Sequence, residues 1–255
     1  TLDRSSAASD VYKRQPEFFE KLKPRYSNNG VFQLINTSIL NAFGLNDKNR
    51  GEEMSHYYDE QPDVKSNPKR ISYQIKNVQL ELTTDAGVFS KDNVDFGSDL
   101  LIKTFLKEHP PGPSKTIVDV GCGYGPIGLA IGKASPHHQI TMLDINNRAL
   151  ALAEMNKTKN QVDNVTIMES DCLSAVNHQC FDYILTNPPI RAGKDIVHRI
   201  FEQAFDRLKT TGELYVVIQK KQGMPSAKKK IEELFGNVEI IAKSKGYYIL
   251  KSIKG

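Results

Sequence analysis

Between residues 116 and 253 the chain alternates short apolar runs with longer segments of helical periodicity. The apolar runs are TIVDV, QITMLD, VTIME, FDYILT and ELYVVIQ, at residues 116–120, 139–144, 165–169, 181–186 and 213–219. The helical segments cover residues 124–135, 146–160, 195–208 and 226–235. Buried strands that alternate with helices predict an α/β fold: a Rossmann-like, mostly parallel sheet with helices on both faces.

Antiparallel elements are expected at both ends of this region. Residues 71–85 alternate apolar and polar side chains about Lys76-Asn77, which predicts a small N-terminal β-hairpin, or β-flap. A helix is expected over 95–109 because its apolar residues recur at helical spacing. Residues 238–253 predict two closing strands joined tightly at Lys245-Gly246, which would form an antiparallel hairpin at the edge of the sheet.

The composition of the 255-residue chain restricts its class. With 39% apolar residues the chain can bury a core, and its formal charge of +4 suits an anionic partner without requiring one. Cys122, Cys172 and Cys180 show neither metal-ligand spacing nor a disulfide framework, so no metal and a reducing compartment are expected. No run reaches the roughly 18 apolar residues of a membrane helix, and no signal-peptide core is visible. A cytoplasmic monomer that does not enter a membrane is therefore expected.

A glycine-rich loop follows the first apolar run. Gly121 and Gly123 allow the backbone to turn tightly and a ligand to approach it, just before a helix N-terminus. Asp144 ends the next run, where a carboxylate can accept hydrogen bonds from the ribose hydroxyls of a nucleoside cofactor. A nicotinamide fingerprint would need glycine or alanine in place of Pro126, and Asp119 could hold a cationic amine, so the pattern favours S-adenosylmethionine. A tight turn without a ligand is the alternative explanation of the glycines.

The segment after the third apolar run supplies another candidate. Asp171 is expected near the adenine ring of the cofactor, although a solvated helix cap explains this residue nearly as well. Its neighbour Cys172 is expected to pack as a small apolar side chain rather than to react.

The sequence TNPPI, residues 186–190, ends the fourth apolar run with a rigid polar corner. Ligands of open α/β sheets bind outside the carboxyl ends of the strands, so Asn187 is expected in the site. Its side-chain carbonyl and the backbone carbonyl of Pro188 could accept both hydrogens of one exocyclic amino group and direct its lone pair at a methyl donor. Pro188 and Pro189 fix φ and remove N–H donors that would compete for these carbonyls. An ordinary Pro-Pro strand terminator is the alternative.

Four segments together resemble one known family. They are DAGVFSKDNVDFGSDLL (85–101), DVGCGYGPIG (119–128), TNPPIRAGK (186–194) and VIQKKQGMPSAKK (217–229). They are similar to class I S-adenosylmethionine-dependent methyltransferases, and among these to the ribosomal RNA guanine-N(2) methyltransferases that act on the small subunit. The resemblance covers roughly residues 54–255. It implies a cofactor pocket bordered by Phe89, Ser90, Asp95 to Gly97 and Asn187, a cofactor bound by Gly121, Gly123 and Asp144, and a target amine received by Asn187 and Pro188.

The first 53 residues differ in character from the rest. Residues 5–15 resemble translated sequencing-adapter sequence, and only residues 31–43 have a helix-like apolar pattern. Residues 50–53 could be encoded by a purine-rich ribosome-binding site, so Met54 is hypothesised to be the start, with a genuine extension as the alternative. Longer members of the family carry an additional N-terminal domain for which this chain has no room. The expected organisation is a non-native or disordered extension at 1–53, the β-flap at 54–94 and the methyltransferase domain at 95–255.

A basic rim is expected around the TNPPI corner. Arg191, Lys194, Lys220 and Lys221 follow the carboxyl ends of two predicted strands, where they could neutralise phosphates beside a target base. Lys228 to Lys230 belong to the same cluster, but they could equally be the solvated face of a surface helix.

The sequence therefore predicts methyl transfer from S-adenosylmethionine to the exocyclic amine of a guanine in ribosomal RNA, with the small subunit as the expected partner. Asn187, Pro188 and Pro189 are the predicted catalytic residues. DNA adenine methyltransferases that resemble this class are expected to have an aromatic residue after the two prolines, where it stacks on a flipped base. This chain has Ile190 there, which disfavours a DNA adenine methyltransferase. A protein glutamine methyltransferase, which also holds a planar NH₂ group, and a non-catalytic RNA-binding module are the alternatives.

Overall fold

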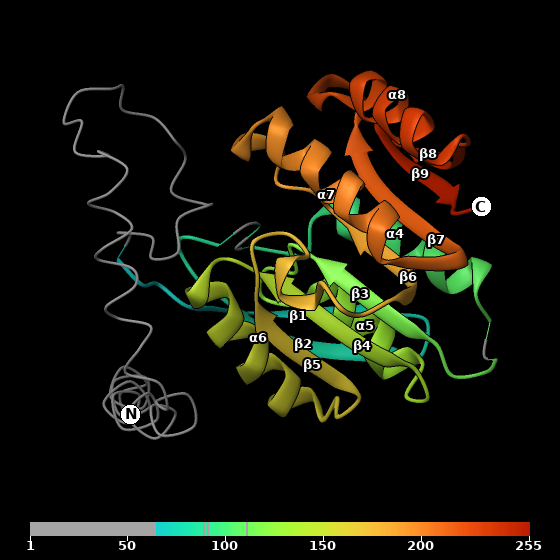
Figure 1. The fold of residues 1–255 in the computed structure, drawn as a ribbon. Helices are drawn as coiled ribbons and strands as arrows, with labels where there is room; N and C mark the ends of the chain where they lie inside the picture. Colours follow the sequence, from blue (N-terminus) through green and yellow to red (C-terminus); the bar gives the residue numbers. More distant parts are fainter. Residues whose placement is uncertain (1–64, 89, 91, 111) are drawn as a thin grey trace, which may run out of the picture. The chain divides into compact units, whose positions relative to one another are not determined.

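The computed structural model describes residues 65–88, 90, 92–110 and 112–255 (Figure 1). The proposed start at Met54, the adapter-like segment, the helical pattern at 31–43 and the candidate Phe89 lie outside the described residues. The expected domain boundaries at 53 and 94 therefore stay predictions.

The main element is a seven-stranded sheet in the order β5-β4-β3-β6-β7-β9-β8. Its strands are β3 (Thr116–Val120), β4 (Gln139–Asp144), β5 (Val165–Glu169), β6 (Phe181–Thr186), β7 (Leu208–Gln219), β8 (Glu239–Ser244) and β9 (Tyr247–Ile253). Strands β3 to β7 pair in parallel, whereas β9 pairs antiparallel with both β7 and β8. The prediction of a mostly parallel sheet with an antiparallel hairpin at its edge is confirmed.

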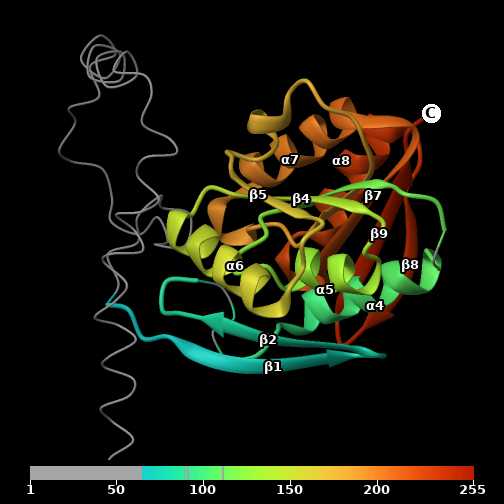
Figure 2. The same cartoon turned by 90° about the horizontal axis from the view of Figure 1, so that it is seen from below.

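Helices cover both faces of this sheet. Buried side chains of α4 (Phe96–Glu108), α5 (Pro126–Ala134) and α6 (Asn147–Asn160) belong to one apolar cluster. Those of α7 (Lys194–Arg207) and α8 (Met224–Phe235) belong to a second cluster, on the opposite face (Figure 2). Short 3-10 turns complete the connections: η2 (Ser174–Val176), η3 (Ile190–Ala192) and η4 (Lys220–Gln222). Within the described part of the chain, no helix combines the length and the apolar character that crossing a bilayer requires.

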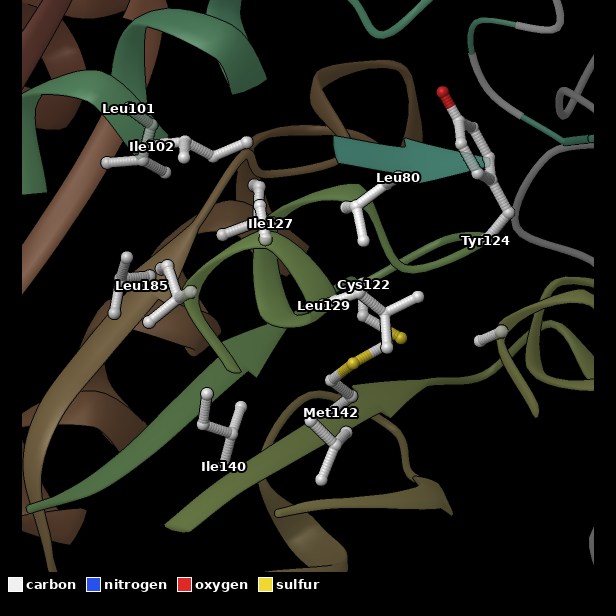
Figure 3. Close-up of a cluster of buried hydrophobic side chains, with 14 of the residues drawn as sticks. Leu80, Leu101, Ile102, Cys122, Tyr124, Ile127, Leu129, Ile140, Met142 and Leu185 are labelled. Atoms are coloured by element: carbon white, nitrogen blue, oxygen red, sulfur yellow. The ribbon is translucent and has the colours of Figure 1, made fainter. Parts of the chain in front are cut away.

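Helix α5 lies close to the sheet because its sequence contains glycines on the packed side. A Cβ atom added at Gly128 would lie 2.5 Å from the Met142 side chain, so only glycine fits at this contact. Figure 3 shows Met142 beneath Ile127 and Leu129, inside the cluster that Leu80 closes from the other side. The close packing brings the N-terminus of α5, and the loop before it, against the carboxyl ends of β3 and β4.

The predicted N-terminal hairpin is present as β1 (Lys69–Ile75) and β2 (Val78–Thr84), which pair antiparallel around Lys76-Asn77. Figure 2 shows it beneath α4, α5 and α6, as an additional layer on that face. Leu80 and Leu82 of β2 are fully buried in the same cluster as the helices. The hairpin is therefore part of the core of this face.

Two asparagines of α6 bind the backbone of β2 as a neighbouring strand would. Asn156 Oδ1 accepts a hydrogen bond from the Thr83 N–H at 2.6 Å, and its Nδ2 donates to the Thr83 carbonyl at 2.9 Å. Asn160 makes the same pair of contacts with Glu81, both at 2.9 Å. The two side chains thus satisfy backbone groups that an edge strand would otherwise leave unpaired.

A polar network joins the end of α4 to β7 and β9. Glu213 Oε2 accepts a hydrogen bond from Tyr215 Oη at 2.7 Å and lies 3.1 Å from His109 Nε2, while its Oε1 lies 3.1 Å from Lys251 Nζ. Burial alone would raise the pKa of Glu213, but the hydrogen bonds from these three partners outweigh it and lower the pKa to about 2.

This network predicts a loss of stability in acid. Because the pKa of Glu213 in the folded protein lies below its unfolded value of 4.5, its stabilisation is complete above pH 4.5 and is lost as the pH falls toward 2. We expect Glu213→Gln to lower the free energy of unfolding at pH 7 by about 1–2 kcal/mol. Urea unfolding at several pH values would show the difference from the unmodified protein shrinking between pH 5 and pH 2. A difference in the free energy of unfolding that does not vary with pH would show that ionisation of Glu213 is not its cause. As a control, replacing the exposed Glu154 by glutamine should leave the free energy of unfolding unchanged.

Candidate active site

The glycine-rich loop connects β3 to α5 in the conformation that its sequence requires. Gly121, Gly123 and Gly125 have φ values of 73°, 57° and 96°, which favour glycine over residues with a side chain. The Gly121 and Cys122 N–H groups both donate to the Leu143 carbonyl, at 2.8 and 2.9 Å. The loop is thereby fixed against the end of β4.

Asp144, at the end of β4, holds the same loop. Its Oδ2 accepts a hydrogen bond from the Gly123 N–H at 2.8 Å, and its Oδ1 accepts one from the Asn146 N–H at 2.9 Å. Burial raises the pKa of Asp144, and the backbone hydrogen bonds oppose that rise. The carboxylate therefore lies between the loop and the carboxyl edge of the sheet, and its contact with ribose hydroxyls stays a prediction.

Two hollows meet at this edge of the sheet, and Gly121 lines both. The first is lined by Val120, Gly121, Asp144, Ile145, Ser170, Cys172, Pro189 and Ile200. The second is lined by Asp95, Ser98, Gly121, Cys122, Gly123, Tyr124, Pro126, Ile127 and Asn187. The structure thus brings together residues from the glycine loop, β4, the TNPPI corner and the start of α4.

Asp119 lies beneath the glycine loop with 1% of its surface exposed. Its Oδ2 accepts a hydrogen bond from the Gly128 N–H at 2.9 Å. Its Oδ1 is buried and has no hydrogen-bond partner among the described residues. Burial raises the pKa of Asp119 to about 7. A buried carboxylate with an unpartnered oxygen suits a nearby cation, although Asp119 is absent from the lining of both hollows.

The amide of Asn187 is held in one orientation. Its Nδ2 donates hydrogen bonds to Asp95 Oδ1 at 3.2 Å and to Ser98 Oγ at 3.1 Å. A carboxylate only accepts hydrogen bonds, so the NH₂ end of the amide faces Asp95 and the carbonyl end is presented as an acceptor. Asp95 is itself fixed as the N-cap of α4, because the same Oδ1 accepts the Ser98 N–H at 3.1 Å.

Ser98 was missed by sequence reasoning, as were Tyr124, Ile145, Ser170 and Ile200 among the lining residues. A signal for Ser98 existed, because it is the third residue after the N-cap Asp95, and the N–H group at this position bonds to the side chain of the cap. The apolar lining residues carry no chemical signal of their own.

Several predicted residues act indirectly in this structure. Ser90 belongs to the loop before α4, and its carbonyl accepts a hydrogen bond from Tyr124 Oη at 3.3 Å, which ties that loop to the glycine loop. Gly97 leaves room for close packing, since a Cβ atom there would lie 3.0 Å from both Asp95 Oδ1 and the Tyr247 ring. The contact roles expected of these two residues stay predictions.

Asp171 lies outside both linings, although its neighbours Ser170 and Cys172 line the first hollow. Its Oδ1 lies 2.7 Å from an Arg199 guanidinium nitrogen of α7. Its expected place beside an adenine ring stays a prediction, and Cys172 is buried as expected.

The predicted basic rim follows two neighbouring strands. Arg191 in η3 and Lys194 at the start of α7 come after β6, and Lys220 and Lys221 in η4 come after β7. All four residues are exposed, and β6 pairs in parallel with β7, so the two groups share the edge that carries Asn187. In contrast, Lys230 lies 2.6 Å from Glu202 of α7, and Lys229 lies 3.8 Å from Glu233 within α8, so each of these lysines already faces a carboxylate.

Comparison with known proteins places the chain in a family. Residues 79–251 match the model of the methyltransferase small domain. The chain is 52% identical over 200 residues to the "Uncharacterized protein YbxB" of Bacillus subtilis (strain 168), covering 78% of this chain and 98% of that protein. It is 29% identical over 240 residues to the "Ribosomal RNA large subunit methyltransferase G" of Psychromonas ingrahamii, covering 88% of this chain and 61% of that one.

A solved structure has the same fold. It is a 16S rRNA N2 methyltransferase of T. Thermophilus in complex with AdoMet and Guanosine, with a TM-score of 0.68 and 23% identity. The match covers 76% of this chain and 52% of that chain, so this chain spans about half to three fifths of the ribosomal RNA methyltransferases it matches. The chain belongs to the methyltransferase small domain family, which confirms the methyltransferase predicted from its motifs.

Proposed function

We propose that the protein transfers a methyl group from S-adenosylmethionine to the exocyclic N2 amine of a guanine in ribosomal RNA of the small subunit. The fixed amide of Asn187 is the observation that carries this proposal. Asp95 and Ser98 hold the NH₂ end of that amide, so its carbonyl is available to accept a hydrogen bond from a substrate amine.

The cofactor would be held by groups from both hollows. Asp144 would accept hydrogen bonds from the ribose hydroxyls, and Ile145, Cys172 and Ile200 offer apolar surface for the adenine ring. Gly121 lets the backbone approach the ligand where the two hollows meet. When bound, S-adenosylmethionine supplies an electrophilic methyl group on a positively charged sulfur.

The chain's own contribution to methyl transfer is to position the amine. Asn187 Oδ1 and the Pro188 carbonyl would accept its two hydrogens, which favours a pyramidal nitrogen with its lone pair directed at the methyl group. The lone pair forms the new C–N bond as the electrons of the C–S bond return to sulfur. The amine proton then passes to water, so no dedicated base is required.

The choice of ribosomal RNA rests on charge and on the matched proteins. The exposed rim of Arg191, Lys194, Lys220 and Lys221 lies at the edge that carries Asn187, where it could neutralise phosphates. Matched proteins include a large-subunit methyltransferase and a 16S rRNA N2 methyltransferase. The second name favours guanine N2, whereas the first makes the large subunit the main alternative.

The substrate can be tested with the purified protein, labelled S-adenosylmethionine and a panel of small subunits, large subunits, their naked RNAs, transfer RNA and a release-factor protein. Nucleoside and amino-acid analysis would identify the product. Label in N(2)-methylguanosine from small-subunit RNA would support the proposal, and the same nucleoside from the large subunit would correct its partner. Label on glutamine would replace it with a protein methyltransferase, and no label on any substrate would contradict it.

Asp119 predicts a pH-dependent cofactor affinity. Its pKa of about 7 would be lowered by the cationic amine of the cofactor, so binding below pH 7 must release a proton. We expect the Kd for S-adenosylmethionine to rise about fivefold between pH 7 and pH 6, and Asp119→Asn to abolish this change. Calorimetry in two buffers of different ionisation enthalpy would count the released protons. Equal proton release in Asp119→Asn would assign the effect elsewhere, with Asp144 as the next candidate.

A further inference from the structure

Two aromatic rings lie side by side at the start of α4. Phe96 is the first residue of α4 and Tyr247 the first residue of β9, and their ring centroids are 5.5 Å apart with an interplanar angle of 48°. Both side chains are partly exposed. The Lys245 ammonium lies 4.8 Å from the centroid of Phe96. We call Phe96 and Tyr247 the aromatic pair.

The aromatic pair adjoins the residue that orients Asn187. A Cβ atom at Gly97 would lie 3.0 Å from both the Tyr247 ring and Asp95 Oδ1, so ring and carboxylate flank the same glycine. Asp95 Oδ1 is the atom that accepts the Asn187 hydrogen bond. Asp95 also contributes, after burial, to the raised pKa of Tyr247. Neither ring lines the two hollows, so the pair lies beside the proposed cofactor site and not within it.

Further exposed lysines follow the strand that neighbours Tyr247. The Lys220 N–H donates to the Gly246 carbonyl at 2.9 Å, which ties η4 to the turn that carries Lys245. Lys220, Lys221 and Lys245 are all exposed at this place. Aromatic rings among lysines are the arrangement by which proteins bind single-stranded nucleic acid: the rings stack on bases and the cations contact the phosphates.

We propose that the aromatic pair and these lysines form a subsite for an unpaired nucleotide next to the target guanine in the RNA. This inference rests on the proposed function for the identity of the RNA. The TNPPI corner has Ile190 after its prolines and offers no aromatic ring of its own to a base. A base that stacks on the pair displaces Lys245 from Phe96, because base stacking is generally stronger than an exposed cation–π contact, and the freed ammonium remains near the phosphates.

The chain contains matched controls for both features. Phe205 on α7 also has a lysine near its ring, Lys254 at 5.0 Å, and a second ring at 5.0 Å, Phe235. Lys243 stands on the same closing hairpin as Lys245 but lies over Tyr248, whose side chain belongs to the cluster on the opposite face of the sheet. Phe205→Leu and Lys243→Gln therefore repeat the chemical changes away from the proposed subsite.

The test measures RNA binding apart from catalysis. Fluorescence anisotropy with a labelled 12-nucleotide single-stranded RNA, and with the same RNA carrying abasic residues, would be compared for each variant in the presence of S-adenosylhomocysteine. We expect Tyr247→Leu, alone and combined with Phe96→Leu, to raise the Kd for the intact RNA about tenfold but not for the abasic RNA. Lys245→Gln should raise both Kd values about threefold and reduce the salt dependence by about one counterion. The Kd for S-adenosylmethionine should remain unchanged in Tyr247→Leu and in Lys245→Gln.

The results separate this subsite from the proposed function. If Tyr247→Leu leaves the RNA affinity unchanged, the subsite is wrong even if the protein methylates guanine. The same holds if Phe205→Leu or Lys243→Gln weakens RNA binding as much as Tyr247→Leu or Lys245→Gln does. Weaker binding of S-adenosylmethionine by Tyr247→Leu would also overturn it, because the pair would then support the cofactor site. Tyr247-dependent RNA binding without methyl transfer to ribosomal RNA would instead keep the subsite and contradict the proposed function.

Discussion

Replacement of Asn187 by alanine is expected to slow methyl transfer by about 30- to 1,000-fold, which corresponds to about 2–4 kcal/mol of transition-state stabilisation. The substitution removes the carbonyl that would accept an amine hydrogen, while Asp95 keeps its hydrogen bond from the Ser98 N–H and the start of α4 stays capped. The loss should therefore appear in kcat, with the Kd for S-adenosylmethionine changed less than threefold. Single-turnover kinetics and calorimetry would measure the two quantities.

Two further variants separate positioning from contact. Ser98→Ala removes one of the two acceptors of Asn187 Nδ2 but leaves Asp95, so its rate should fall less than that of Asn187→Ala. Asn177→Ala changes an exposed asparagine outside both linings and should have no effect. Full activity of Asn187→Ala would refute the assigned role, and an equal loss in Ser98→Ala would show that the orientation of the amide matters more than its carbonyl.

Asp144→Ala is expected to raise the Kd for S-adenosylmethionine by about 30- to 300-fold, or roughly 2–3.5 kcal/mol. Removing the carboxylate deletes the proposed acceptor of the ribose hydroxyls and leaves the Gly123 and Asn146 N–H groups without their acceptor. Asp144→Asn keeps one carbonyl oxygen and should show an intermediate affinity. Calorimetry would measure both values.

A matched control for this prediction is Asp163→Ala, which changes an exposed aspartate outside both hollows. It should leave the cofactor affinity unchanged. If Asp144→Ala binds S-adenosylmethionine as well as the unmodified protein does, the ribose contact assigned to Asp144 is wrong.

Much of the fold could be predicted because the chain marks its elements locally. Apolar strand runs, Pro126 at the start of α5 and the Lys245-Gly246 turn each indicate one kind of structure, and the observed elements follow them. The start of β7 was less clear. The apolar run indicated a strand from Glu213, but the observed strand already begins at Leu208, in a stretch with polar side chains. Leu208 pairs with Phe181 of β6 before a register shift, and the backbones of Thr211 and Gly212 bond to Lys254, just after β9. Backbone hydrogen bonds rather than hydrophobicity therefore extend this strand.

The details of the site depend on contacts between distant parts of the sequence. Asn187 and Asp95 are 92 positions apart in the sequence but are joined by a hydrogen bond in the structure, and neither motif indicates that one side chain orients the other. Asp171 follows a strand, and nothing in its motif indicates that its side chain pairs with Arg199 of α7. Sequence patterns could identify which edge of the sheet carries the chemistry, whereas the partner of each side chain required the three-dimensional arrangement.

The Asn156 side chain makes a contact beyond its pairing with Thr83: its Nδ2 also donates to the Tyr124 carbonyl, within the glycine-rich loop, at 2.9 Å. One side chain therefore belongs at once to the docked hairpin and to the cofactor loop. Coupling between two equilibria is reciprocal. If docking of the hairpin strengthens ligand binding by a given free energy, a ligand that orders the loop must stabilise the docked hairpin by the same free energy. Hydrogen exchange at the Thr83 amide, in a strand that contributes no lining residue to either hollow, becomes a distant reporter of cofactor occupancy.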